Sequence, residues 1–496
     1  MVHYGLLLLA SALGGGLMWA SFDPLDLPLL AFPALMILAL VTRAGGMVFG
    51  FAAGTFWGLA FFLPLIEWTW TAVGEPLPWV ALSLFQALFI GLVGAIWAGL
   101  WRMDGIPAAV LGAIAFAGVE VVRTNWPWGG FPWGMVAYSQ VGTPLLRTAP
   151  YIAAVGVTLL TVLVALLLAM ALRWLYEGPR LAGLATGLVA VIAVAACVAI
   201  PLSVRGTDTM TVGWVQGGPD RGEHDSGRAL NVTLRHEEET ERLLATTDGI
   251  DLLLWPESGS DRDIRVDPEA AAIARRVSLG AGVPLLIGTQ EYVDEGRYND
   301  YALVINGEMV SHYSKSRPVP FGEYIPSRDF FRRFTEAVDL VTTDMLAGDG
   351  PATITVPIGE RSEMLAVPIC FEIAIDSVIQ DAINAGGRAL IVPVNSASFG
   401  DSAESEQQMK QTIFRAVEYS RAAVQVSTVG VSGVVMPNGT VTQLSDKQTN
   451  ASGAATIPLR DHLTPAARYG HLYRGVAVGG ALLALIWAFA LRKERQ

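Results

Sequence analysis

The seven residues Ala366-Val-Pro-Ile-Cys370-Phe-Glu372 close an apolar run that begins at Met364. A short continuous apolar run of this kind predicts a buried strand, here up to Ile369. A cysteine at the end of such a strand can face a cleft while the strand behind it stays rigid. A thiol nucleophile needs that position, a base for its proton and a positive group for the charge that develops. We therefore expect Cys370 to attack an acyl group.

The composition indicates a membrane protein that also has room for a soluble domain. Only 16% of the 496 residues are charged, whereas a soluble domain has about 25%, and the mean hydropathy is +0.45. The net charge of −12 argues against nucleic acid as a partner, because phosphate binding requires a basic surface.

The two cysteines, Cys197 in an apolar run and Cys370 beside a polar motif, are not expected to form a disulfide. The sequence has no CxxC or HExxH motif and no cluster of histidines. We therefore expect no metal site, and no other cofactor is implied.

About eight apolar runs approach the roughly 20 residues that a membrane-spanning helix requires. They cover residues 4–20, 27–41, 47–66, 78–101, 106–122, 151–172, 181–202 and 475–491. More apolar runs follow the first one directly, which favours a retained helix over a cleaved signal peptide. The expected organisation is a membrane domain with seven helices over residues 1–203, a polar domain over 204–472, and a last helix with a cytoplasmic tail over 473–496.

The charges of the loops orient these spans. If every span crosses, basic residues gather on one side: Arg43, Arg102, Arg173, Arg180 and the tail Arg492-Lys-Glu-Arg495. The positive-inside rule makes that side cytoplasmic, although Arg123 and Arg147 fall on the other side. The polar domain is then expected outside the cytoplasm, with both termini inside.

The segment from Arg123 to Gly134 is rich in tryptophan, proline and glycine. One interpretation is an aromatic belt at the membrane interface, and the other is a rigid wall near an active site. Glu120, near the end of its span, is a functional candidate because ionisable groups are costly inside a membrane. Its alternative role is an ion pair with Arg123.

From Met210 onward, short apolar runs alternate with polar stretches of helical pattern. The runs predict strands over residues 210–215, 250–254, 284–287, 301–305, 309–313, 353–356, 364–369, 389–394, 423–427 and 433–436. The stretches between them predict helices over residues 228–247, 268–280, 375–385 and 404–420. This alternation is typical of an α/β or α+β domain with packed sheets.

Three polar residues each follow one of the predicted strands: Glu257, Lys315 and Cys370. Strands that lie side by side would bring these residues together at one edge. A free thiol has a pKa of about 8.5 and is mostly protonated at neutral pH. Glu257 is therefore the expected base, and Lys315 is the expected stabiliser of the thiolate and the oxyanion. Each residue alone is weak evidence, since a lone buried cysteine usually serves as a small apolar side chain.

The sequence around these residues strengthens the hypothesis. Similarity to the Glu-Lys-Cys motifs of the nitrilase superfamily lies at Trp255-Pro-Glu-Ser258, Lys315-Ser-Arg-Pro-Val-Pro-Phe-Gly-Glu-Tyr-Ile-Pro326 and Pro368-Ile-Cys-Phe-Glu372. With spans before and after the polar domain, the whole chain resembles the bacterial apolipoprotein N-acyltransferase family. Further parts of that family are matched by Trp214-Val-Gln-Gly217, Phe131-Pro-Trp133 and Arg415-Ala-Val-Glu418.

The resemblance implies an α-β-β-α sandwich on a base of eight membrane helices, in the inner or plasma membrane of a bacterium. It also implies that an acyl chain passes from a phospholipid to the α-amine of a lipoprotein's diacylglyceryl cysteine. Glu257 would then be the base, Lys315 would stabilise the oxyanion, and Cys370 would form the thioester. The supporting positions implied by the resemblance are Glu323, Glu372, Asn299, Tyr324 and Phe371.

Three parts of the sequence depart from the family pattern. Asn395-Ser-Ala-Ser-Phe-Gly400 stands where Asn-Asp-Ala-Trp-Phe-Gly is usual, so an acid and a large aromatic residue are missing. Gly218 stands where asparagine is common, and Phe371 where tyrosine is common. These differences concern the positioning of the substrate more than the three central residues.

The segment from Tyr324 to Leu346 carries Phe330, Phe331, Phe334 and several aliphatic residues. It has two interpretations: an amphipathic helix packed on the domain, or a mobile apolar arm that covers the cleft and enters lipid. The spans on both sides of the polar domain favour the arm. Such a cover matters because a thioester waits for its acceptor only where water is excluded.

Two other functions remain open. A membrane-tethered amidase of the same superfamily would share the three central residues and use water as its acceptor. A non-enzymatic scaffold with a decayed site is supported only by the departure at residues 395–400. A serine acyltransferase is not indicated, since the sequence has no GxSxG motif.

Overall fold

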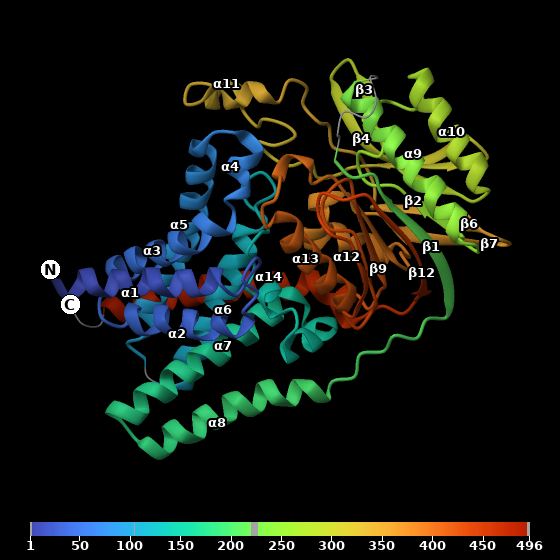
Figure 1. Ribbon diagram of the computed structural model, residues 1–496. Helices are drawn as coiled ribbons and strands as arrows, with labels where there is room; N and C mark the ends of the chain where they lie inside the picture. The colour runs from blue at the N-terminus through green and yellow to red at the C-terminus, as the bar shows by residue number, and fades with distance from the viewer. Residues whose placement is uncertain (1, 104, 220–226, 494–496) are drawn as a thin grey trace. The chain divides into compact units, whose positions relative to one another are not determined.

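The computed structural model describes residues 2–103, 105–219 and 227–493 (Figure 1). The end of the expected tail, residues 494–496, lies outside these described residues. By the contacts within it, the chain divides into two compact units: Met1–Pro201 with Arg468–Gln496, and Leu202–Ala467. We call them the helical unit and the sandwich unit.

The helical unit is built from long apolar helices. Among the described residues, seven helical segments are long and apolar enough to cross a membrane: Val2–Trp19 (α1), Met47–Leu65 (α3), Pro76–Leu100 (α5), Ile106–Arg123 (α6), Pro144–Glu177 (containing α7, Ala149–Glu177), Arg180–Ala199 (containing α8, Arg180–Ala196) and Pro465–Leu491 (within α14, Pro465–Lys493). A shorter apolar helix covers Pro28–Thr42 and contains α2 (Ala31–Thr42). Each of the eight predicted runs therefore corresponds to a helix, although the last helix begins at Pro465 instead of residue 475.

Small residues let two of these helices approach each other closely. Gly54 of α3 faces α5, and a Cβ added there would lie 2.2 Å from the carbonyl oxygen of Ile90. A Cβ added at Gly94 of α5 would lie 2.1 Å from the carbonyl oxygen of Gly50. Close backbone contact of this kind supports helix association in a membrane, where lipid chains are as apolar as the side chains.

Two charged residues at the end of α6 hold the tryptophan-rich segment in place. Glu120 accepts hydrogen bonds from the backbone N–H of Val136 (2.9 Å) and from the Thr158 hydroxyl (2.6 Å). Arg123 donates to the side chain of Gln86 and to the carbonyl oxygens of the segment at residues 131 and 133, at 2.9–3.0 Å. These contacts assign both groups a structural role, in tying the segment to the helices.

The described residues of the sandwich unit form two six-stranded sheets, which Figure 1 shows. The first has the order β12-β1-β2-β3-β4-β5, with bounds Ala451–Leu459, Asp208–Gln216, Leu252–Leu254, Leu285–Val293, Gly296–Ile305 and Glu308–Ser314. The second has the order β11-β10-β9-β8-β7-β6, with bounds Val441–Leu444, Gly433–Val435, Ala423–Ser427, Leu390–Val394, Arg361–Ala366 and Thr353–Ile358.

Helices cover the outer face of each sheet. The first sheet packs against α9 (Arg228–Thr246) and α10 (Pro268–Ala281), and the second against α12 (Asp376–Asn384) and α13 (Glu404–Glu418), as Figure 1 shows. Leu243 of α9, Ile273 of α10 and Trp255 after β2 share one buried apolar core. Since helices lie outside both sheets, the unit is the α-β-β-α sandwich that the sequence predicted.

Two strands were missed by the sequence analysis, β11 and β12. The first six residues of β12, Ala451 to Thr456, are small or polar and have little preference for strands. β12 nevertheless pairs along its whole length with β1, in antiparallel register from Asp208–Leu459 to Gln216–Ala451. Pairing across the fold therefore outweighs the local preference.

Of the two interpretations of the segment from Tyr324 to Leu346, the structure does not show the amphipathic helix. The segment forms only the short helix α11 (Arg328–Phe331) and a 3₁₀ turn over Glu336–Leu340. Phe330, Phe334 and Leu340 are exposed. The segment is thus an irregular stretch with apolar side chains on its surface.

Arg415 of α13 connects this helix to the turn that begins at Cys370. It is fully buried and forms ion pairs with Asp376 (2.6 Å) and Glu418 (2.5 Å). Its guanidinium also donates to the carbonyl oxygens of Ile373 (3.0 Å) and Ala374 (2.9 Å). A buried arginine with this many partners leaves several groups unsatisfied when it is removed.

Replacing Arg415 by alanine is expected to lower the free energy of unfolding by about 3–5 kcal/mol, because two buried carboxylates lose their cation. Thermal unfolding of the detergent-solubilised protein measures the change. The matched control is Arg275→Ala, which breaks the exposed ion pair with Glu308 (3.3 Å) and is expected to cost about 0–1 kcal/mol. Equal losses in the two variants would contradict the structural role of Arg415.

Candidate active site

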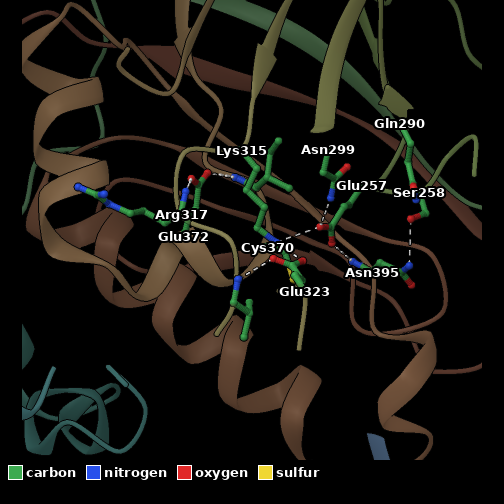
Figure 2. Close-up of polar contacts among 12 residues, drawn as sticks. Glu257, Ser258, Gln290, Asn299, Lys315, Arg317, Glu323, Cys370, Glu372 and Asn395 are labelled. Carbon is green, nitrogen blue, oxygen red and sulfur yellow. Dashed lines mark hydrogen bonds and ion pairs between the residues drawn. The ribbon is translucent and has the colours of Figure 1, made fainter. Parts of the chain in front are cut away.

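The structure brings the three strand-end residues together in the sandwich unit (Figure 2). The Lys315 ammonium donates to Oε1 of Glu257 at 3.2 Å, and the Cys370 thiol lies close enough for both charged groups to act on its pKa. Glu257 is 4% exposed and Lys315 is 0% exposed, whereas Cys370 is partly exposed. A carboxylate, an ammonium and a thiol thus meet at one edge where two of the three groups are shielded from water.

Glu257 is held by contacts on both of its oxygens. Asn299 donates to Oε1 at 2.6 Å, and the backbone N–H of Asn395 donates to Oε2 at 2.9 Å. The neighbouring strand β3 passes so close that a Cβ at Gly288 would lie 2.2 Å from the Glu257 carbonyl oxygen. Burial raises the pKa of Glu257, and Lys315 opposes that rise. The carboxyl group is therefore a stronger base than a solvated glutamate.

Lys315 lies between two carboxylates. Its ammonium donates to Glu323 at 2.6 Å as well as to Glu257, and the second oxygen of Glu323 accepts the backbone N–H of Val319 at 2.7 Å. Burial acts to lower the pKa of Lys315, but the two carboxylates outweigh it and raise the pKa well above its ordinary value. The ammonium therefore keeps its charge although the side chain is fully buried.

Cys370 has an unusual backbone conformation. Its φ is +53°, in the left-handed region that non-glycine residues rarely adopt. It does not directly follow a strand residue, because β7 ends at Ala366 and the 3₁₀ turn η6 (Cys370–Ala374) begins at Cys370 itself. The predicted strand up to Ile369 was thus three residues too long. A strained residue of this kind persists only where its surroundings hold it.

Glu372 provides much of that support. Its carboxylate accepts the backbone N–H groups of Ile369 (2.9 Å), Ser316 (2.9 Å) and Arg317 (3.0 Å), as part of the network in Figure 2. The Tyr313 hydroxyl donates to the same carboxylate at 2.9 Å. Glu372 therefore ties the turn at Cys370 to the segment that carries Lys315.

The Cys370 thiol is protonated in the resting site. Burial raises its pKa well above the ordinary value, and the Glu257 carboxylate adds to that rise, while Lys315 opposes it. Gln408 of α13 donates an amide N–H to the sulfur at 3.7 Å. These surroundings favour the protonated thiol.

The other predicted site residues lie less centrally. Phe371 is buried within η6 beside the cysteine. Tyr324 is half-buried, and its carbonyl oxygen accepts the N–H of Phe321 at 2.8 Å. In the described part of the chain, its side chain makes no hydrogen bond with Glu257, Lys315 or Cys370.

Two contacts were not anticipated from the sequence. Asn395 directly follows β8, so the signal that selected the three central residues, a polar side chain after a strand, was present there as well. It also accepts from Thr428 and donates to Ser258, both at 3.0 Å, which fixes its backbone near Glu257. Gln408 lies in the middle of a helix, where the sequence carries no comparable signal.

One group of potential metal ligands occurs elsewhere in the described residues, formed by Glu291, Asp300 and His312. The guanidinium of Arg265 already lies 2.7 Å from Asp300 and 3.6 Å from Glu291. This arginine supplies the positive charge at that place, so the donor set does not fit a metal ion.

Comparison with known proteins places the chain among membrane acyltransferases. Residues 14–167 match the profile described as the apolipoprotein N-acyltransferase N-terminal domain. The apolipoprotein N-acyltransferase of Mycolicibacterium smegmatis is 31% identical, over 97% of this chain and 85% of its own length. The proteins of the same name from Gloeobacter violaceus (26%; 96% and 93%) and Azotobacter vinelandii (27%; 97% and 94%) are similar over comparable lengths.

Among solved structures, the crystal structure of an amidase from Nesterenkonia sp. aligns with a TM-score of 0.40 at 17% identity, over 55% of this chain and 98% of that one. The relationship to the Mycolicibacterium protein extends over nearly the whole chain. It includes the helical unit as well as the sandwich unit, and the first of these also matches the family profile. The chain belongs to the apolipoprotein N-acyltransferase family.

Proposed function

We propose that this protein moves an acyl chain from a phospholipid to the α-amine of a lipoprotein's N-terminal diacylglyceryl cysteine, through a thioester on Cys370. One observation carries the proposal: the buried Lys315 ammonium donates to the Glu257 carboxylate at 3.2 Å, and both charged groups lie close enough to the Cys370 thiol to act on its pKa. The family relationship and the apolar helices point to lipid substrates.

The first half-reaction forms the thioester. Glu257 accepts the proton of the thiol as the sulfur attacks the ester carbonyl carbon of the phospholipid. The Lys315 ammonium stabilises the oxyanion that develops. The carbon–oxygen bond then breaks, and the leaving lysophospholipid oxygen takes the proton back from Glu257.

The second half-reaction transfers the acyl group. The neutral α-amine attacks the thioester carbonyl carbon, and the nitrogen loses a proton to Glu257. The carbon–sulfur bond breaks, and the sulfur takes that proton to restore the thiol. Because the lysophospholipid leaves before the acceptor reacts, the kinetics are ping-pong.

Transfer prevails over hydrolysis where water is kept from the thioester. The segment from Tyr324 to Leu346 is the proposed cover. Its side chains Phe330, Phe334 and Leu340 are exposed. Because exposure of apolar side chains to water is unfavourable, they are suited to the acyl region of a membrane surface. We assign Tyr324 and Phe371 to substrate positioning and Glu323, Glu372 and Asn299 to the support of the three central residues.

The thioester itself is the first testable intermediate. Incubation of the purified protein with a labelled phospholipid is expected to add one acyl chain to Cys370, detected by mass spectrometry. Cys370→Ala is expected to abolish the adduct, while Cys197→Ala keeps it, because Cys197 lies in the helical unit. Absence of any adduct in the parent protein would indicate a decayed site, and release of free acid from a soluble amide without lipid would indicate an amidase.

Glu257→Gln is expected to lower the pKa of the Cys370 thiol and at the same time to slow its reaction with the phospholipid. The change removes a negative charge that raises the pKa of Cys370, so that pKa falls. Formation of the acyl adduct nevertheless slows by about 10²–10⁴-fold, because the base is lost. The pKa is measured from the pH dependence of alkylation in a Cys197→Ala background.

The control for this experiment is Glu269→Gln, which alters an exposed carboxylate paired with Arg262 at 2.9 Å and should leave both quantities unchanged. A Glu257→Gln variant that forms the adduct at the parent rate would remove Glu257 from the mechanism.

We propose that the sandwich unit lies outside the cytoplasm and that both termini lie inside. In a background without native cysteines, Glu269→Cys is expected to react with a membrane-impermeant maleimide in intact spheroplasts. Glu177→Cys, at the exposed end of α7, is expected to react only after the membrane is permeabilised. Reaction of both, or the opposite order, would overturn the proposed orientation.

A further inference from the structure

Helix α13 presents two buried polar side chains to the candidate site. Glu404 and Gln408 are four residues apart, so they lie on one face of the helix one turn apart. They are 2% and 0% exposed. Gln408 reaches the Cys370 sulfur through its amide nitrogen at 3.7 Å, and the charge of Glu404 acts on the same thiol. This face of α13 therefore borders the reacting sulfur.

Each of the two side chains has an oxygen atom that the fold leaves unsatisfied. Among the residues that the structure describes, Oε2 of Glu404 and Oε1 of Gln408 have no hydrogen-bond partner. The Ser396 hydroxyl donates to the Glu404 carboxylate and does not fill this need. A buried acceptor without a donor is unfavourable, and in native proteins such a group often marks a functional position.

The chemistry of these two atoms selects the kind of group that they can receive. Oε1 of Gln408 is an acceptor, and so is Oε2 of Glu404 in the carboxylate form, so the pair suits a ligand with several N–H donors and a positive charge. The acyl ester of a phospholipid offers only acceptor oxygens at its reacting end. The α-amine of the second substrate offers N–H donors and can carry a positive charge.

We propose that Glu404 and Gln408 bind the α-amine of the lipoprotein acceptor beside the thioester, and that Glu404 takes the first proton from it. This inference rests on the proposed function and deepens it, since it assigns the acceptor a place in the second half-reaction. Glu257 remains the group that exchanges a proton with the Cys370 sulfur.

The proton balance of the step is complete. An acceptor that arrives as an ammonium ion gives one proton to the Glu404 carboxylate and becomes a neutral amine. The nitrogen then attacks the thioester carbon, its second proton passes through Glu257 to the sulfur, and the carbon–sulfur bond breaks. Glu404 afterwards releases the first proton to water, which is the one proton that amide formation from an ammonium ion sets free.

The surroundings of Glu404 suit this exchange. Burial raises its pKa to about 8, and the carboxylates of Glu406 and Glu257 add to the rise, while Ser396 and Lys447 oppose it. An α-amine has a pKa of about 7.7–8.0. A proton therefore passes between the two groups at little cost in free energy.

The position of Glu404 also bears on the departure at residues 395–400. Ser396 occupies the place where the family pattern usually has an acid, and it donates its hydroxyl to Glu404. Glu404, the first residue of α13, thus places a carboxyl group beside the loop of residues 395–400, which lacks the acid that the family pattern has there.

The two half-reactions are measured separately in the full-length protein. The donor is a vesicle containing labelled phosphatidylethanolamine, and the acceptor is a synthetic peptide whose N-terminal cysteine carries a diacylglyceryl thioether. Glu404→Gln is expected to form the Cys370 adduct within about three-fold of the parent rate. Loss of the adduct on addition of the peptide is expected to slow by about 10- to 100-fold, as for loss of a hydrogen bond to a charged group.

Glu269→Gln is the matched control. It removes the same charge at an exposed position, where the carboxylate pairs with Arg262 at 2.9 Å, and it should change neither step. Glu404→Asp keeps the acid but shortens its reach, so it should retain more of the transfer rate than Glu404→Gln.

Two results would overturn the inference. The first is an unchanged transfer rate in Glu404→Gln. The second is equal slowing of both steps, which would mean that Glu404 supports the thiol or the fold and does not bind the acceptor. If Glu404→Gln does not fold, transfer in Glu404→Asp at the parent rate has the same meaning. A parent protein that forms no adduct would instead contradict the proposed function, and this result is distinct from the others.

Discussion

The site is organised around a buried ammonium group, that of Lys315, between the carboxylates of Glu257 and Glu323 at 3.2 and 2.6 Å. A charge that is fully shielded from water is stable only when opposite charges and hydrogen bonds surround it. Glu257 and Glu323 must therefore remain in place, and Asn299 and the backbone N–H of Asn395 hold the first of them. The same arrangement keeps the base, the cation and the thiol at fixed distances.

The strained cysteine depends on this polar network in turn. Glu372 joins the turn at Cys370 to the segment after Lys315, and Arg415 joins the same turn to α13. Both side chains are fully buried. An unfavourable backbone conformation persists when such contacts over-determine it. Contacts in the core of the sandwich unit thus offset the unfavourable backbone conformation that places the Cys370 sulfur at the edge.

The apolar helices make this chemistry relevant to lipids. The chain is a membrane protein of the apolipoprotein N-acyltransferase family, and the cysteine chemistry proposed for its sandwich unit allows hydrolysis as well as transfer. Whether hydrolysis or transfer occurs depends on the access of water to the thioester and on the binding of the acceptor amine. The exposed phenylalanines of residues 330–334 and the polar face of α13 are the features of this chain that bear on those two requirements.

The sequence by itself predicted the apolar helices, a mixed domain of packed sheets and helices, and the meeting of three polar residues at one edge, because these follow from local patterns: long apolar runs, short buried strands and a polar residue after each of three strands. It did not determine β12, whose small residues form a strand only through pairing with β1, or the irregular course of residues 324–346. It did not indicate the positive φ of Cys370 or the approach of Gln408 and Asn395 to the site. Those features arise from contacts between segments far apart in the chain, and burial and backbone strain of this kind exist only once the tertiary structure has formed.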